Sequence, residues 1–505
     1  MTKNVLEYLE RSVRKAPDKT AVIDGQGSYS FMAAERNSRL VGTVLADKIN
    51  IRTPVAVMME KGFLALCAFW GIVYAGGYYV MLNPELPKER LKKIQEVLNA
   101  EYVITDINSR SMAEEIFPSS SVLMAEEMTE GHIDNERLQK IRSCMIDTDP
   151  LYVNFTSGST GVPKGVVVSH RSVIDFIDVF TELFDITGED IIGNQAPFDF
   201  DVSVKDIYST LKTGGTMVII PRHLFSKPKE LLDLICDRKI TTMIWAVSAL
   251  CLISTFHGLD YRTPEEVNKI LFSGEVMPPK HLREWREHLP KARFVNLYGP
   301  TEITCNCTYH IINHDYDYPD GVPIGKAFPN EHVFLLGENG QVTAQGEIGE
   351  ICVRGAALAL GYYGAKEQTE EVFVQNPLNS LFHERIYRTG DLGCYGADGE
   401  LYFCGRKDFQ IKYMGHRIEL EEIELVISGI KGVERCCLAF DGDRQKLYGF
   451  YTGNIEKKEL HAMLSELLPV YMIPGKLCKL TELPITKNGK LDRKKLLEGQ
   501  GKKHE

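Results

Sequence analysis

The chain has 505 residues, of which 44% are hydrophobic and 25% are charged, and its formal net charge is −11 at pH 7. This composition is that of an ordinary globular protein, and the length predicts more than one domain. The acidic balance and the lack of a basic tract argue against nucleic acid as the main partner. No apolar run reaches membrane-spanning length, so we expect no membrane insertion. We also expect the protein to be a monomer.

The 12 cysteines are scattered along the chain without a C-x-x-C pair. The adjacent Cys436 and Cys437, and the alternating Cys305 and Cys307, look like strand residues. No signal peptide is recognisable, so we expect reduced thiols and a cytoplasmic location.

Strand and helix patterns alternate through the first part of the chain. This alternation predicts mostly parallel sheets covered by helices, which is an α/β fold. The expected helices cover residues 4–14, 31–46, 62–74 and 87–98, and the expected strands cover 21–24, 55–58, 78–82 and 102–105.

The most informative stretch is YVNFTSGSTGVPKGVVVSH, residues 152–170. Two β-prone runs enclose a loop of Gly, Ser and Thr that also contains Lys164. Its glycines let the backbone approach an anion, and its hydroxyl, N–H and ammonium groups suit a phosphate. A Walker A loop is excluded, because Pro163 precedes the lysine and Gly165 follows it. On local evidence alone, a flexible hairpin loop is the alternative.

This string resembles the signature loop of the adenylate-forming enzymes, the superfamily of acyl-CoA synthetases, luciferases and nonribosomal-peptide adenylation domains. Three later motifs agree with it in order: VNLYGPTE at 295–302, YRTGDL at 387–392 and LPITKNGKLDR at 483–493. The resemblance thus covers essentially the whole chain. Residues 271–277 and 405–419 look most like D-alanine–carrier-protein ligases and their stand-alone adenylation relatives.

The resemblance implies a site for ATP and Mg²⁺. Tyr298 would stack on adenine, and Asp391 would bind both ribose hydroxyls. Arg406 would contact ribose or phosphate. Thr301 would donate to the α-phosphate, and Glu302 would be the Mg²⁺ ligand. The other ATP contacts implied are Thr156, Ser157, Gly158, Ser159, Thr160, Gly161, Lys164, Asn296, Gly299 and Lys490.

The stretch PFDFDVSVKDIYSTL, residues 197–211, contains the S-x-x-D pattern of a capping box, so we expect a helix to start at Val204. Asp201 then lies just outside that helix. An ordinary turn aspartate is the alternative on local evidence, but the resemblance implies that Asp201 holds the α-ammonium group of an amino acid. Asp199 ranks second for this role.

Among the pocket residues implied by the resemblance, Leu297, Leu271 and Trp245 would fill much of the space, which suggests a substrate with a small side chain. Lys205 is unusual, because a cation in the first turn of a helix is opposed by the macrodipole. It is either a solvated surface lysine or a contact for a substrate hydroxyl or carboxylate. The expected lining is Asp201, Val202, Lys205, Trp245, Ala246, Leu271, Ser273, Leu297, Cys305 and Asn306.

The family pattern also divides the chain. It implies a large adenylation domain of helix-covered sheets and a β-rich subdomain over residues 1–407. A small mobile α+β domain then covers residues 408–505, with Asp408 as the hinge. The small domain would carry Lys490, presented by a tight Asn-Gly turn. Lys490 would touch the substrate carboxylate and the α-phosphate, and Thr301 and Glu302 would complete the catalytic residues.

Together these implications predict ATP-dependent activation of a small amino acid as aminoacyl-AMP, with release of pyrophosphate. Transfer to the phosphopantetheine thiol of a carrier protein would follow. The sequence ends shortly after the lysine motif, so we expect the carrier protein to act in trans. An acyl- or aryl-CoA ligase that uses coenzyme A is the alternative, and a catalytically silent nucleotide-binding relative is a third.

Overall fold

The computed structural model describes residues 2–158, 161–319, 321–408, 410–442, 444–484 and 491–501. The chain forms two compact units, one of Met1–Asn83, Ala100–Asn154 and Gly165–Lys407, and one of Pro84–Asn99, Phe155–Lys164 and Asp408–Glu505. A search of these described residues finds no helix that is both long and apolar enough to span a membrane.

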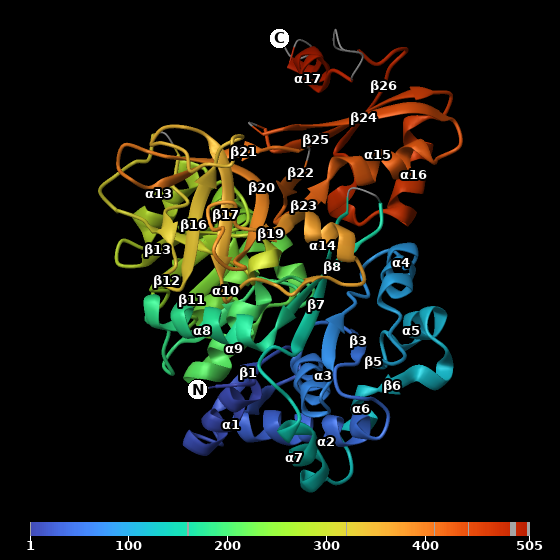
Figure 1. Cartoon of the computed structure of the whole chain (residues 1–505), viewed down its shortest axis with the longest axis vertical. Coiled ribbons are helices and arrows are strands. Elements are labelled where there is room, and N and C mark those ends of the chain that lie inside the picture. The colour runs from blue at the N-terminus through green and yellow to red at the C-terminus, as the bar shows by residue number, and fades with distance from the viewer. Residues whose placement is uncertain are drawn as a thin grey trace. The chain divides into compact units, whose positions relative to one another are not determined.

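A nine-stranded sheet lies in the larger unit, in the order β15-β14-β13-β12-β11-β9-β10-β1-β2. Figure 1 shows its neighbouring strands β11, β12 and β13. The strands from β13 to β1 in this order run parallel, and the strands at both ends pair antiparallel. The loops that follow β9, β11, β12 and β13 therefore meet at one edge of the sheet. The bounds are β1 (Thr20–Ile23), β2 (Ser28–Ser30), β9 (Ile191–Asn194), β10 (Thr216–Ile219), β11 (Thr242–Ala246), β12 (Lys269–Ser273), β13 (Arg293–Tyr298), β14 (Thr308–Ile311) and β15 (Lys326–Ala327).

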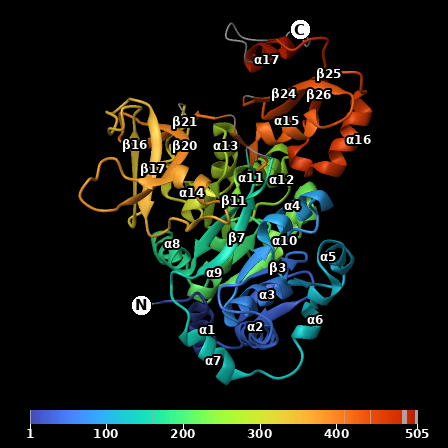
Figure 2. The ribbon, with the colours of Figure 1, turned by 45° about the vertical axis from the view of Figure 1, so that its right-hand side comes forward.

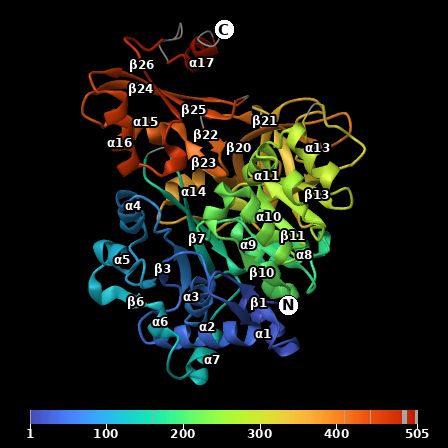
Figure 3. The same ribbon diagram turned by 180° about the vertical axis from the view of Figure 1, so that it is seen from behind.

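Both faces of this sheet are buried, as expected for parallel strands covered by helices. Leu271 and Val295 belong to an apolar cluster that includes residues of α8 (His170–Leu183) and α9 (Ser203–Thr213). Trp245 and Phe272 belong to another cluster, with residues of α10 (Pro228–Asp237), α11 (Val247–Thr255) and α13 (Pro279–His288). Figure 3 shows α10 and α11 beside β11.

A seven-stranded sheet has the order β18-β8-β7-β4-β3-β5-β6. Its strands β3 to β6 run parallel, which confirms the predicted architecture. The helices α2 (Phe31–Ala46) and α3 (Phe63–Tyr74) lie side by side (Figure 2). The bounds are β3 (Pro54–Met58), β4 (Tyr78–Met81), β5 (Val103–Thr105), β6 (Val122–Met124), β7 (Pro150–Thr156), β8 (Lys164–Ser169) and β18 (Gly361–Tyr362), and further helices are α1 (Leu6–Lys15), α5 (Arg110–Ile116), α6 (Ala125–Met128), α7 (Asn135–Ser143) and α12 (Gly258–Tyr261).

A five-stranded antiparallel sheet forms the expected β-rich part. Its order is β16-β17-β20-β19, and β21 pairs with β20. This last pairing places Asp391 opposite Arg406. The bounds are β16 (Glu331–Leu336), β17 (Gly349–Gly355), β19 (Phe373–Gln375), β20 (Arg385–Tyr395) and β21 (Leu401–Arg406), with α14 (Lys366–Val372).

The smaller unit is α+β. A two-stranded and a three-stranded sheet pack with helices around an apolar core that includes Ile423, Leu438 and Leu460. The helices are α4 (Lys88–Leu98), α15 (Leu420–Ser428), α16 (Lys457–Leu467) and α17 (Arg493–Gly501), and the strands are β22 (Gln410–Tyr413), β23 (His416–Glu419), β24 (Val433–Asp441), β25 (Lys446–Gly453) and β26 (Lys476–Lys479).

Two local predictions are wrong. The Ser203 hydroxyl does not cap α9, because it donates to the carbonyl oxygen of Phe200 at 2.7 Å, and the helix begins at Ser203 itself. Cys305 and Cys307 are not strand residues, since β14 begins only at Thr308.

Candidate active site

Tyr298, at the carboxyl end of β13, contacts Asp391, the residue predicted to bind the ribose hydroxyls. Its hydroxyl donates to Asp391 Oδ2 at 2.5 Å, and Arg406 Nη1 donates to Oδ1 of the same carboxylate. Asp391 is 1% exposed. Burial of Tyr298 raises the pKa of its phenol well above the ordinary value, and the Asp391 charge adds to this shift, so the phenol stays a donor. A carboxylate accepts about four hydrogen bonds, which leaves capacity for two ribose hydroxyls.

Glu302 lies just after β13, in the short 3-10 helix η3 (Thr301–Ile303), and is fully buried. The Tyr362 hydroxyl donates to Glu302 Oε1 at 2.7 Å, and the Ala359 N–H donates to the Glu302 carbonyl at 2.8 Å. Thr301, beside it, is half-buried. Sequence reasoning missed Tyr362, which fixes the position of this carboxylate.

The described residues contain no cluster of three or more His, Cys, Asp or Glu side chains that could hold a metal ion. Mg²⁺ in nucleotide sites commonly uses one or two carboxylates and completes its shell with phosphate oxygens and water. The buried carboxylate of Glu302 fits that pattern. Glu302 would be the protein ligand, and the bound ion would neutralise phosphate charge.

A strained turn follows. Thr304 and Cys305 have φ values of 55° and 89°, in the left-handed region that side chains rarely adopt. Such strain costs about 1–3 kcal/mol per residue and needs support from its surroundings. Thr304 Oγ1 donates to the Ala357 carbonyl at 2.7 Å. Gly299 permits the turn to approach, since a Cβ there would lie 2.5 Å from Asn306 Cα.

This turn directs two side chains toward the start of α9. The Cys305 thiol donates to the Asp201 carbonyl at 3.0 Å, and Asn306 Oδ1 accepts from Lys205 Nζ at 2.7 Å. Asp201 itself precedes α9 and is half-buried, as are Val202 and Asp199.

Lys205 is fully buried, so the surface-lysine alternative is wrong. Burial lowers its pKa, and the nearby Cys305 and Asp201 oppose that shift. The hydrogen-bond partner that the described residues give this ammonium is the amide oxygen of Asn306, not a carboxylate. A buried cation with a neutral partner is costly, which makes this position a candidate for recognition of an anionic or polar ligand group.

A second buried group supports the first turn of α9 and was missed by sequence reasoning. Asn194, at the end of β9, donates to Asp206 Oδ2 at 2.7 Å and accepts from Lys61 Nζ at 3.1 Å. Burial raises the pKa of Asp206 to about 7 and lowers the pKa of Lys61 to about 7. The only signal in the sequence was the charged Lys205-Asp206 pair between the apolar Val204 and Ile207.

Tyr152, in β7, was also missed. Its side chain is fully buried, and in the described part of the chain its hydroxyl has no hydrogen-bond partner. Burial raises the pKa of this phenol well above the ordinary value, and Cys305 and Asp201 add to the shift. A buried hydroxyl without a partner is uncommon in native proteins and is consistent with a ligand-binding position.

Comparison with known proteins decides the family. Residues 9–363 match the model of the AMP-binding enzyme family. The chain belongs to this family. Over 498 residues it is 32% identical to bacitracin synthase 1 of Bacillus licheniformis, a match that covers 97% of this chain but 9% of that protein.

Zwittermicin A synthase ZmaJ of Bacillus cereus is 31% identical over an alignment of 508 positions that covers 98% of this chain and 95% of that protein. A solved structure of PA1221, a nonribosomal peptide synthetase protein containing adenylation and PCP domains bound to a vinylsulfonamide inhibitor, has a TM-score of 0.82 at 25% identity and covers 98% of this chain and 84% of that one. These matches confirm the adenylate-forming superfamily and the α/β fold. The finer likeness to D-alanine–carrier-protein ligases stays a prediction.

The expected pocket residues of this AMP-binding enzyme fall on two faces of the nine-stranded sheet. Leu271, Ser273 and Leu297 share one face, and Ala246 pairs in register with Ser273. Trp245 faces the other way, where its Nε1 donates to the Gly193 carbonyl at 2.8 Å. The expectation that Trp245 fills the space beside those leucines is therefore wrong.

Asn296 shares the Trp245 face, because it is the register partner of Phe272. Its side-chain amide donates to the Pro323 carbonyl at 2.8 Å. Asn296 thus connects β13 to the segment around Pro323, and its predicted contact with ATP stays a prediction.

The glycine-rich loop of the AMP-binding enzyme lies between β7 and β8. The Gly161 N–H donates to the Gly158 carbonyl at 2.9 Å, and Gly161 has a φ of 76°. The Ser157 hydroxyl donates to the Arg417 carbonyl at 2.7 Å, and Lys164 Nζ lies 4.0 Å from Glu419 Oε1. The Thr156 hydroxyl oxygen is buried without a partner among the described residues.

Three predicted residues, Ser159, Thr160 and Lys490, lie outside the described residues. Asp408 is exposed and opens the last segment of the smaller unit. Its Oδ1 accepts from the Gln410 N–H at 3.2 Å.

Proposed function

We propose that this enzyme uses ATP to activate a small amino acid as aminoacyl-AMP, releases pyrophosphate, and then passes the aminoacyl group to the phosphopantetheine thiol of a separate carrier protein. The observation that carries this proposal is the segment after β13. It leads from Tyr298, which binds Asp391, through buried Glu302 to Asn306, which binds Lys205. The residues proposed to bind the nucleotide and those proposed to bind the amino acid thus follow one another along a single segment of the chain.

The chemistry accounts for these residue types. A carboxylate has no good leaving group, and transfer to AMP supplies one. The substrate carboxylate attacks the α-phosphorus in line, and pyrophosphate leaves. Positioning and electrostatic stabilisation of the charge on phosphorus are the main catalytic tasks. Thr301 and Lys490 would donate to that charge, with Glu302 holding the ion.

Asp201 favours an amino acid over a plain acyl substrate. A carboxylate shielded from water makes a strong charge-assisted contact with an ammonium group. Asp201 is half-buried, and its carbonyl accepts from the Cys305 thiol at 3.0 Å. The next residue, Asn306, accepts from the buried Lys205 at 2.7 Å. We propose that Asp201 binds the α-ammonium group and that Lys205 meets a side-chain hydroxyl or carboxylate of the substrate.

The proposed size of the substrate side chain follows from the sheet face that carries Leu271, Ser273 and Leu297. Leu271 and Leu297 are both buried there and limit the space, which supports a small substrate. Ser273 adds one more polar group at this edge.

The proposed acceptor is a carrier protein. PA1221 contains both adenylation and PCP domains, and ZmaJ is a synthase whose length this chain almost fully covers. The PA1221 likeness supports a carrier-protein thiol as the acceptor, and we propose that a separate chain supplies it. A CoA ligase is the alternative, and thioester formation with coenzyme A alone, without a holo carrier protein, would favour it.

Two substitutions test the catalytic assignments of the proposed small domain, residues 408–505. Lys490→Ala should abolish ATP–pyrophosphate exchange and leave ATP binding intact, whereas Lys494→Ala, at an exposed lysine nearby, should do neither. Asp408→Pro should reduce thioester formation more than adenylation, because it would stiffen the proposed hinge. Unchanged exchange in the first variant, or equal losses in the second, would contradict these roles.

A further inference from the structure

Two thiols lie in contact on the antiparallel strands β20 and β21. The Cys404 thiol donates to Cys394 Sγ at 3.2 Å. A bulge produces this contact. Leu392 pairs with Gly405 and Gly393 pairs with Phe403, so Cys404 is an extra residue on β21. Cys404 is exposed and Cys394 is half-buried, so small oxidants in water can reach the pair.

We propose that Cys394 and Cys404 are an oxidation site that forms a reversible disulfide with a two-electron oxidant of the peroxide class. The Cys394 sulfur, which accepts the hydrogen bond, attacks one peroxide oxygen. The O–O bond breaks, and the products are a sulfenic acid and water. The Cys404 sulfur then attacks the Cys394 sulfur, and the hydroxyl leaves as water with the Cys404 proton. Two thiols and one H₂O₂ thus give one disulfide and two waters.

This site is linked to the proposed nucleotide site, and that link rests on the proposed function. Asp391 lies on β20 and Arg406 on β21, and the two side chains form an ion pair close to the thiols. A disulfide has an S–S length of about 2.05 Å, so its formation draws Cys404 toward β20. Arg406 lies two residues further along β21 and moves with it. We expect the KM for ATP to rise about threefold to tenfold on oxidation, which corresponds to a weakened hydrogen bond at Asp391.

Peroxide treatment of the full-length reduced protein, followed by peptide mass mapping, tests the site. The expected product is a cross-link between the two cysteine peptides, with the loss of two hydrogens and reversal by dithiothreitol. Cys404→Ser should stop at a sulfenic acid on Cys394 that dimedone captures, and Cys394→Ser should give no cross-link. Cys144→Ser removes an exposed thiol elsewhere and should behave as the wild type. Over-oxidation of either cysteine without a cross-link would overturn the proposal.

Kinetics of ATP–pyrophosphate exchange separate this proposal from the proposed function. A cross-link with an unchanged KM for ATP would overturn the link to Asp391. Absence of exchange in the reduced enzyme, with a normal cross-link, would refute the proposed function and leave the oxidation site standing. Normal exchange without a cross-link would refute the oxidation site and leave the proposed function standing.

Discussion

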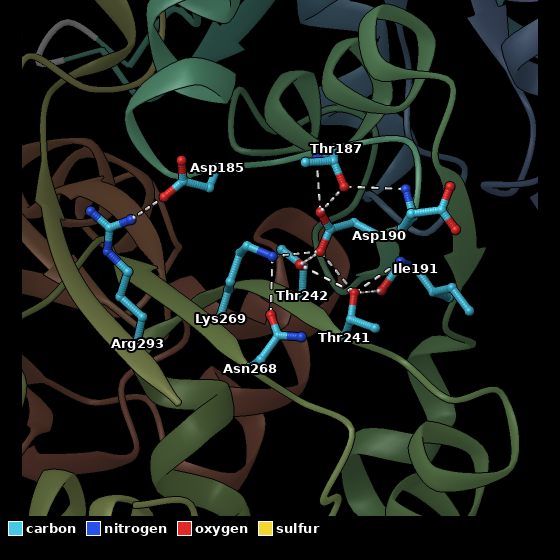
Figure 4. A network of polar contacts seen from close by, with 10 residues as sticks. Asp185, Thr187, Asp190, Ile191, Thr241, Thr242, Asn268, Lys269 and Arg293 are labelled. Atoms are coloured by element: carbon cyan, nitrogen blue, oxygen red, sulfur yellow. Dashed lines mark hydrogen bonds and ion pairs between the residues drawn. The ribbon is translucent and has the colours of Figure 1, made fainter. Parts of the chain in front are cut away.

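The parallel strands of the nine-stranded sheet have a buried aspartate near a lysine at their amino-terminal ends and another at their carboxyl-terminal ends. We call these two sides of the sheet its amino-terminal and carboxyl-terminal edges. The two aspartates differ in how their charges are paired. At the amino-terminal edge, Asp190 accepts from Lys269 Nζ at 2.8 Å and from Thr242 Oγ1 at 2.7 Å (Figure 4). Thr241 Oγ1 and the Thr187 N–H also donate to it, at 2.9 Å and 2.8 Å. This carboxylate is fully paired.

At the carboxyl-terminal edge the charges are separated. Lys205 donates to the Asn306 amide oxygen, and Asp206 accepts from the Asn194 amide. Asp206 Oδ1 is buried with no hydrogen-bond partner among the described residues. Here the backbone is also strained, at Thr304 and Cys305.

We infer from this difference that the amino-terminal ends of the strands serve stability and that the carboxyl-terminal ends serve the proposed function. A fully paired network repays the cost of burying its charges, whereas separated charges and strain are tolerated where a ligand completes them. The same contrast appears in acidity. Burial would raise the pKa of Asp190, but hydrogen bonds from Lys269, Thr187 and Thr242 hold it below the ordinary value. Burial raises the pKa of Asp206 to about 7.

The largest expected effect is on ATP use. Asp391→Asn should lower kcat/KM for ATP about 100-fold to 1,000-fold, because each hydrogen bond from ribose to a charged group contributes about 1.5–3 kcal/mol. Steady-state exchange kinetics at varied ATP measure it. The control Asp398→Asn changes an exposed aspartate that also lies near the β20–β21 hairpin and should leave ATP use unaltered. Equal kinetics in both variants would remove Asp391 from the nucleotide site.

The amino-terminal edge should respond in stability instead. Asp190→Asn should lower the free energy of unfolding by about 3 kcal/mol, because it leaves the Lys269 charge without its buried partner. Urea unfolding followed by circular dichroism measures the loss, and activity per folded molecule should not change. Asp185→Asn is the control, since its ion pair with Arg293 is exposed and should contribute less than about 1 kcal/mol (Figure 4). A loss of activity without a loss of stability in Asp190→Asn would contradict the stabilising role inferred for Asp190.

The two aspartates should also differ in their pH dependence. Asp206 has a raised pKa, so the unfolded chain binds fewer protons between about pH 4 and 7 and its carboxyl loses stability as pH rises through that window. Asp206→Asn should therefore be more stable than the wild type at pH 8, by about 2 kcal/mol, and the gain should vanish near pH 4.

The loss in free energy of unfolding caused by Asp190→Asn serves as the reference for the pH dependence of Asp206→Asn. Because the pKa of Asp190 is lowered, its stabilisation is present above the ordinary value and is lost only as pH falls below it. The penalty should stay constant from pH 5 to pH 8 in urea titrations. A pH-independent difference between Asp206→Asn and the wild type would contradict the assigned burial of that charge.

The smallest expected effect concerns selectivity. Lys205→Met keeps the volume of the side chain but removes its ammonium, so the preference among amino acids should shift about 10-fold to 30-fold toward apolar side chains. Stability should change by less than about 1 kcal/mol, because no ion pair is broken. An amino-acid panel in the exchange assay measures it. Lys212→Met, at the end of the same helix, is the control. An unaltered ranking would exclude Lys205 from the substrate site.

Much of the fold could be predicted from the sequence. The helix over Phe31–Ala46 begins and ends where its apolar spacing predicts, and the helix at Lys88–Leu98 begins one residue later than predicted and ends as predicted. Cys436 and Cys437 lie in β24 as expected. These elements have one apolar face and obey local rules, so periodicity was sufficient.

The site could be predicted only in part. Lys205 lies in a helix buried on every side from Ser203 to Leu211, and local propensity carries no information about such tertiary coverage. The left-handed backbone at Thr304 depends on support from Ala357, which is distant in sequence. The face occupied by Trp245 follows from strand register, where a shift of one residue exchanges the faces. Long-range packing, not local pattern, decided each of these positions.

ATP–pyrophosphate exchange, measured across a panel of D- and L-amino acids with the wild type and Asp201→Asn, tests the central claim most directly. We expect exchange above background with a small polar amino acid, and a loss of about 100-fold in the variant with ATP binding retained, because the α-ammonium group loses its ionised partner. Exchange with no amino acid, or equal exchange in both proteins, would contradict the account.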